Sequence, residues 1–103
     1  MSVLVEFAMF PTDKGESVSE HVSKVIKMVR ESGYEYKLSP MGTTFETETF
    51  SEATEVLNKA YAILEPYCSR VYSSVKFDIR KEKSNRLAGK IKSIEEKIGK
   101  VNS

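Results

Sequence analysis

Hydrophobic and polar residues alternate along the first ten positions, a pattern typical of a β-strand with one buried face. The two faces consist of Val3, Val5, Phe7 and Met9 on one side and Leu4, Glu6, Ala8 and Phe10 on the other. The first face is entirely apolar and the second is mixed. The sequence from Pro11 to Gly15 is rich in turn-forming residues, so we expect the strand to end there.

A helical spacing of apolar residues follows. Ser17 and Glu20 have the spacing of a capping box, and Gly33 lies where a helix of this length would end. The apolar stripe between them consists of Val18, Val22, Val25, Ile26 and Val29. These features predict a first helix.

Two short strands joined by a tight turn come next. The segments from Tyr34 to Leu38 and from Thr43 to about Thr49 alternate in character. Between them, Ser39, Pro40 and Gly42 suit the first, second and last positions of a β-turn. We therefore predict a hairpin whose third strand presents Phe45 on the buried side.

The rest of the chain predicts a helix, a strand and a last helix. Ser51 is the expected cap of the second helix, which Pro66 ends or kinks. A fourth strand is predicted from Arg70 to about Arg80. From Asn85 onwards, Leu87, Ile91, Ile94, Ile98 and Val101 form a narrow apolar seam on an otherwise charged helix. Such a seam needs a surface, supplied either by this domain's own sheet or by a neighbouring subunit.

The element order β-α-β-β-α-β predicts a single α+β domain over residues 1–103. This order allows two right-handed crossover connections and one hairpin. The ferredoxin-like βαββαβ sandwich has these connections, with an antiparallel sheet of strand order 4-1-3-2 and helices on one face. The C-terminal helix is an addition to this plan.

The other face of the predicted sheet carries the most informative polar residues. Strand one contributes Glu6 there, and the neighbouring strands contribute Thr44, Glu46 and Lys76. One interpretation is a site for a flat heterocycle bearing an amine, with oxygen atoms accepting its N–H groups and aromatic rings stacking on it. The alternative is ordinary cross-strand charge pairing on a solvated face, and the pattern alone favours this alternative.

Composition narrows the class of function. The net charge is +1, although the segment from Arg80 onwards is basic. We expect no nucleic-acid partner, because Glu95 and Glu96 interleave with the lysines of that segment. The N-terminal apolar run is too short for a membrane span, so no membrane partner is expected. The single cysteine, Cys68, excludes an internal disulfide and is compatible with a cytoplasmic location.

No sequence motif indicates catalysis. His21 is the single histidine, and the glycines are too scattered for a phosphate-binding loop. We predict no catalytic residue, no metal site and no cofactor. An acid–base pair formed by Glu6 and Glu46 is the one enzymatic alternative that the residues allow.

Three stretches resemble the thiamine-binding, YkoF-like family: Tyr36–Glu46, Ser69–Arg80 and the helix start at Ser17–Glu20. The most specific element is the run Met41, Gly42, Thr43, Thr44 and Glu46 in the hairpin, followed by Arg70, which opens the last strand. The chain departs from many relatives at Thr47, where they have glycine.

The resemblance implies a non-catalytic protein that assembles into dimers or tetramers and binds thiamine or its hydroxymethylpyrimidine part in vitamin transport or salvage. Together, the sheet pattern and the resemblance give these candidate ligand-binding residues: Glu6, Phe10, Ser39, Gly42, Thr43, Thr44, Glu46 and Arg70. The alternative is an interaction module whose open sheet face only mediates oligomerisation, without a ligand.

Overall fold

A computed structural model describes residues 1–15 and 18–103 of the chain. In chain order the elements are β1 (Ser2–Pro11), α1 (Val18–Glu31), β2 (Glu35–Ser39), β3 (Gly42–Thr47), α2 (Phe50–Leu64), the short 3-10 helix η2 (Glu65–Tyr67), β4 (Val71–Arg80) and α3 (Arg86–Ile98). The predicted elements are all present, with boundaries that differ by one or two residues except at the last helix. This helix ends at Ile98, so Val101 of the predicted seam lies beyond it.

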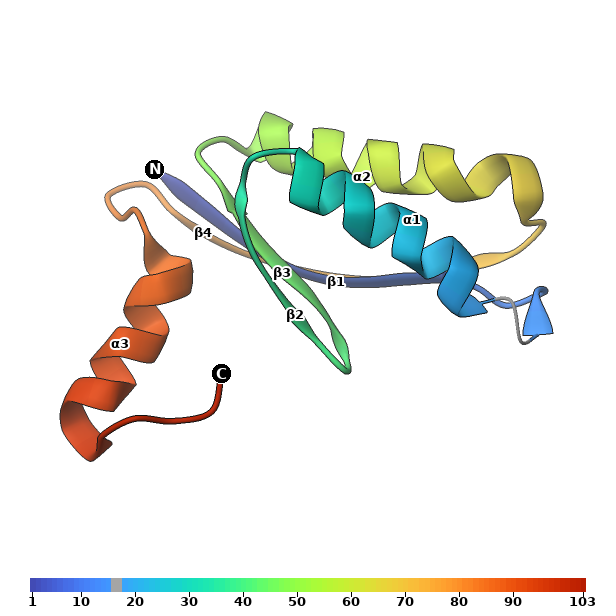
Figure 1. The fold of residues 1–103 in the computed structure, drawn as a ribbon. Coiled ribbons are helices and arrows are strands. Elements are labelled where there is room, and N and C mark those ends of the chain that lie inside the picture. The colour runs from blue at the N-terminus through green and yellow to red at the C-terminus, as the bar shows by residue number, and fades with distance from the viewer. Residues whose placement is uncertain (16–17) are drawn as a thin grey trace.

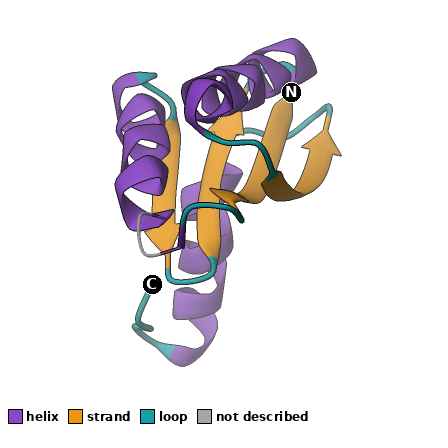
Figure 2. Ribbon diagram, turned by 90° about the vertical axis from the view of Figure 1, so that its right-hand side faces the viewer, coloured by secondary structure: helices purple, strands orange, loops and turns teal. Residues whose placement is uncertain are grey.

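The strands form one antiparallel sheet in the order β2-β3-β1-β4, which confirms the predicted ferredoxin-like fold. Helices α1 and α2 lie on one face of the sheet, and α3 projects from the other side (Figure 1). Figure 2 shows the strands from a second direction, with helices on both sides of them. None of the helices in residues 1–15 and 18–103 is long and apolar enough to cross a membrane.

The core lies between the sheet and the first two helices. Its buried residues are Val3, Val5, Phe7, Met9 and Phe45 from the sheet, Val25 and Val29 from α1, and Ala53, Val56, Ala60 and Leu64 from α2. The alternation along β1 therefore separates its two faces as predicted. On the edge strand β4, Phe77 shares this covered face but stays 39% exposed, and its ring contacts Phe50 at 5.0 Å between centroids.

The start of α2 differs from the prediction. The N-cap is Thr49 and not Ser51, because the Thr49 hydroxyl accepts from the backbone N–H of Glu52 while the Glu52 carboxylate accepts from the N–H of Thr49. This reciprocal capping box ends β3 at Thr47, two residues earlier than expected. The cap predicted for α1 at Ser17 lies outside the described residues.

Candidate functional site

A hollow lies at the end of the sheet where β1 continues beyond its neighbour β3. Strand β1 pairs with β4 along its whole length, from Ser2 to Pro11, whereas its pairing with β3 stops at Phe7. Phe7, Ala8, Met9 and Phe10 all line the hollow, so the edge of the strand itself forms a wall. Alternate residues of a strand direct their N–H and C=O groups to the same edge, so backbone groups of β1 beyond Phe7 that pair with no described residue of β3 face this space.

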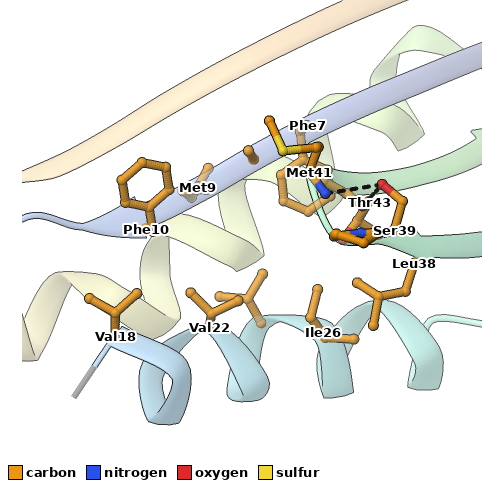
Figure 3. Close-up of a pocket in the computed structure, with 14 residues that line it drawn as sticks. Phe7, Met9, Phe10, Val18, Val22, Ile26, Leu38, Ser39, Met41 and Thr43 are labelled. Carbon is orange, nitrogen blue, oxygen red and sulfur yellow. Dashed lines mark hydrogen bonds between the residues drawn. The ribbon is translucent and has the colours of Figure 1, made fainter. Parts of the chain in front are cut away.

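Helix α1 forms a second wall. Val18, Val22 and Ile26 follow one another at intervals of four residues and point towards Phe10 and the hairpin (Figure 3). All three are half-buried, whereas Val25 and Val29 are fully buried in the core. The apolar stripe of α1 is therefore wider than the core requires, and its surplus faces the hollow.

The tip of the β2–β3 hairpin closes the third side. The Ser39 hydroxyl donates to the carbonyl of Gly42 at 3.1 Å and accepts from the N–H of Met41 at 3.3 Å, which fixes the turn. The apolar side chains of Leu38 and Met41, at this turn, are 64% and 88% exposed to solvent, and these exposed fractions are high for apolar residues. At Gly42, a Cβ atom would lie 3.0 Å from the carbonyl oxygen of Phe7, so glycine allows the hairpin to approach β1 closely.

The resulting pocket has a volume of about 340 Å³, within the usual range for small-molecule sites. No charged side chain is among the residues of 1–15 and 18–103 that line it. The polar groups are the hydroxyls of Ser39 and Thr43 and the backbone edge of β1. This combination suits a small flat ring that needs apolar contact on its faces and a few hydrogen bonds at its rim.

The structure brings together half of the predicted ligand-binding residues. Phe10, Ser39, Gly42 and Thr43 line the pocket. The other four do not: Glu6 and Thr44 lie on the open face of the sheet, Glu46 lies at the start of α3, and Arg70 is exposed, its backbone carbonyl accepting from the N–H of Thr12. Phe10 and Ala8, both predicted for the open face, also border the pocket.

The open face shows cross-strand charge pairing. The Glu6 carboxylate lies 3.6 Å from the Lys76 ammonium, and both side chains are more than half exposed. Thr44, and not Glu46, lies opposite Glu6 in the register. An exposed pair of this kind contributes only about 0–1 kcal/mol to stability.

Glu46 is the acceptor for the start of α3. Its carboxylate accepts from the backbone N–H groups of Arg86 and Leu87 at 2.9 and 3.0 Å, and from the Ser2 hydroxyl at 2.5 Å. Asn85 makes no side-chain capping bond, so Glu46 takes the place of an N-cap residue. Burial raises the pKa of Glu46, but these hydrogen bonds outweigh burial and leave the pKa lowered.

Arg86 completes this polar cluster. Its guanidinium is only 6% exposed, donates to the Ser2 hydroxyl and carbonyl at 3.0 Å, and lies 2.8 Å from the Asp78 carboxylate. Lys90 also contacts Asp78, at 3.1 Å. Hydrogen bonding from Lys90, followed by the charge of Arg86, lowers the pKa of Asp78 despite some desolvation. We call Ser2, Glu46, Asp78 and Arg86 the α3 anchor.

A second, acidic hollow of about 390 Å³ lies beside the α3 anchor. Its carboxylates belong to Glu35, Glu46, Glu48 and Glu52. Those of Glu46 and Glu52 are committed to helix capping, and Glu52 also accepts from the Tyr34 hydroxyl at 3.2 Å. Within the described residues, no three His, Cys, Asp or Glu side chains are grouped so as to hold a metal ion.

Sequence reasoning missed the part of the pocket that α1 supplies. Val18, Val22 and Ile26 were assigned to the core stripe, because a sequence pattern does not distinguish an apolar residue that packs from one that lines a hollow. The available hint was the number of apolar positions on α1, which exceeds one narrow stripe. Met41 in the turn was a second hint, since turns usually carry polar residues.

A comparison with protein-family models shows which family the chain belongs to. Residues 5–95 match the model of a family described as thiamine-binding protein, a span from β1 into α3 that includes the whole pocket. The chain belongs to the thiamine-binding protein family.

Relatives and solved structures agree with this assignment. The UPF0045 protein Mb1933 of Mycobacterium bovis is 33% identical over 92% of this chain and 93% of its own length. The crystal structure of the hypothetical protein MJ1052 of Methanocaldococcus jannaschii superposes with a TM-score of 0.80 at 33% identity, covering 92% of this chain and 97% of that one. A candidate thiamine biosynthesis/salvage protein of Thermotoga maritima, at 21% identity and a TM-score of 0.73, shares the fold.

Proposed function

We propose that this protein binds thiamine or its hydroxymethylpyrimidine part without catalysing a reaction, as a cytoplasmic homo-oligomer that serves vitamin transport or salvage. The observation that carries the proposal is the unpaired edge of β1 inside an apolar pocket. Membership of the thiamine-binding protein family supports it from an independent direction.

The pyrimidine half of thiamine matches the chemistry of this pocket. Its exocyclic amine is a donor and lies next to a ring nitrogen that is an acceptor, so one edge of the ring pairs with the C=O and N–H of one strand residue. Phe10, Val22 and Ile26 then contact the faces of the ring, and the Thr43 hydroxyl, on a side chain only 3% exposed, supplies a further hydrogen bond. The ring thus extends the pairing that β3 leaves incomplete.

The ligand-binding set in this proposal is Phe10, Ser39, Gly42 and Thr43. Glu6 borders the set from the other face, since its Cγ lies 3.9 Å from the position that a Cβ of Gly42 would occupy. Glu46 is left out, because its carboxylate holds the start of α3. Thr44 and Arg70 are left out because they line none of the hollow.

Calorimetric titration of the purified protein with thiamine, hydroxymethylpyrimidine and an analogue lacking the amine tests the proposal. We expect saturable binding with a dissociation constant in the micromolar range, which corresponds to a binding free energy of about 8 kcal/mol. The analogue should bind about tenfold more weakly. Phe10→Ala should abolish most of the binding. Tyr72→Ala is the matched control. The Tyr72 ring lies next to the Phe10 ring, with 5.7 Å between the ring centroids, but Tyr72 does not line the pocket.

The absence of heat with every ligand, from a protein shown to be folded, would overturn the proposal. The interaction-module alternative would then lead, and one observation favours it: Ile94 and Ile98 of α3 are 48% and 73% exposed. In either case we expect the seam of α3 to pack on another subunit. Light scattering should show an even oligomer that Ile94→Ser with Ile98→Ser weakens, and a monomer at micromolar concentration would contradict it.

A further inference from the structure

The pocket opens into a second groove that runs further along α1. This groove, of about 660 Å³, lies between α1 and β2. Val22, Ile26 and Leu38 line both hollows, so the two are continuous. A molecule seated in the pocket therefore has room to extend along the helix.

The two hollows differ in charge. In the part of the chain that the structure describes, no charged side chain lines the pocket, whereas the charged side chains of the groove, Lys27 and Arg30, are both cationic. Both are exposed, and neither makes an ion pair within residues 1–15 and 18–103. Among the described residues, no carboxylate lines the groove to offset them.

The spacing of these cations fits a short ligand. Val22, Ile26 and Arg30 lie at intervals of four along one row of α1, so Arg30 follows Ile26 by about 6 Å along the helix axis. Lys27 precedes Arg30 by three residues, so the two cations are neighbours on the helix surface. A ring held against Val22 and Ile26 would thus place a substituent of one or two bonds within reach of both cations.

We propose that the groove binds the phosphate group of a phosphate monoester whose ring occupies the pocket. This inference rests on the proposed function and narrows its ligand to the phosphate ester of hydroxymethylpyrimidine. Arg30 is suited to the role, because its guanidinium binds two phosphate oxygens at once, and Lys27 adds a point charge. The same cations repel a thiazolium ring, so thiamine itself is the weaker ligand.

The test compares three probes by calorimetry on the full chain at low salt: hydroxymethylpyrimidine, its phosphate monoester and inorganic phosphate. We expect the monoester to bind at least tenfold more tightly than the alcohol, with a gain that shrinks as salt is added. Lys27→Gln with Arg30→Gln should remove the difference between the two ligands. Lys24→Gln, a cation of α1 that lies over the Tyr67 ring and outside the groove, is the control that keeps the difference.

The outcomes separate this inference from the proposed function. If the alcohol binds and the monoester binds no more tightly, or if the double variant keeps the preference, the inference is overturned and the proposed function stands. If inorganic phosphate binds as tightly as the monoester, the anion site does not depend on the pocket and the inference is again overturned. If no ring-containing ligand binds, both proposals fail together.

Discussion

The two ends of β1 lie in opposite surroundings. At its start, Ser2 is 1% exposed and is held by the charged and polar side chains of the α3 anchor. At its end, Ala8, Met9 and Phe10 face an apolar pocket with an unpaired strand edge. One strand therefore joins two different regions. In the α3 anchor most polar groups bond to other protein groups, whereas at the pocket the backbone groups of the strand edge are free to bond to solvent or a ligand.

This contrast indicates that the start of β1 stabilises the fold and that its end is available for binding. A buried charge needs hydrogen-bonding partners, so the α3 anchor is filled by the protein itself and offers little to a ligand. An unpaired strand edge inside an apolar hollow is satisfied by solvent or by a ligand, and exchanging one for the other costs little. We therefore expect substitutions at the two ends to change different measurable quantities.

The largest effect is expected for Arg86→Ala. Removal of the guanidinium leaves the Ser2 hydroxyl and carbonyl without their buried donor and leaves Asp78 with Lys90 alone, which should lower the free energy of unfolding by about 3 kcal/mol. Urea denaturation measures this change, with the exposed Arg80→Ala as control. Equal losses for the two variants would show that the α3 anchor does not stabilise the fold.

Glu46→Gln should cost about 2 kcal/mol near neutral pH, because two backbone N–H groups and a hydroxyl then bond to a neutral amide. The pKa of Glu46 is lowered from 4.5 in the folded state. Its contribution is therefore complete above the unfolded pKa and is lost as pH falls through the folded pKa.

Urea denaturation of both proteins across this pH range tests the point. The unfolding free energies of the natural protein and Glu46→Gln should converge as the solution becomes acidic. The exposed neighbour Glu48→Gln serves as the control. A difference that stays constant down to acid pH would mean that the charge of Glu46 does not stabilise α3.

At the pocket end, Thr43→Val should weaken pyrimidine binding by about fivefold to tenfold, the value of one hydrogen bond of about 1 kcal/mol. The shape of the side chain is kept, so the pocket is retained. Thr44→Val, the neighbour on the opposite face, is the matched control in the same titration. If both variants bind equally well, the Thr43 hydroxyl does not contact the ligand.

The smallest effect is expected for Met41→Ala. Its side chain is 88% exposed, so truncation should change the unfolding free energy by less than about 0.5 kcal/mol. It should still weaken ligand binding by about threefold, since part of the pocket wall is removed. Lys37→Ala, on the other side of the hairpin, should change neither quantity. A loss of stability without a loss of affinity would place Met41 in the fold and not in the site.

The sequence predicted the elements well because each has a local cause. The alternation along Val3–Met9, the spacing of the α1 stripe and the turn residues around Pro40 act over a few positions. The cap of α2 was misplaced by two residues because Thr49 and Ser51 are both good capping residues, and only the position of Glu52 three residues after Thr49 decides between them.

The lining of the pocket was predicted only in part. The hairpin residues Ser39, Gly42 and Thr43 line it, and these three are close in sequence and carry the family resemblance. The role of Glu46 depends on Ser2 and Arg86, which are 44 and 40 positions away, so no local pattern indicated it. Glu46 lies on the open face as predicted, but its carboxylate bonds to Ser2 and to the start of α3.

The sequence by itself determined which segments form strands and helices, which face of β1 is buried and which family the hairpin resembles, because these depend on the spacing of side chains along the chain. Only the tertiary structure decided that β3 stops short of the end of β1, that α1 leaves apolar side chains beside that gap, and that Glu46 anchors α3. Each of these depends on the relative length and position of elements distant in sequence, which packing sets.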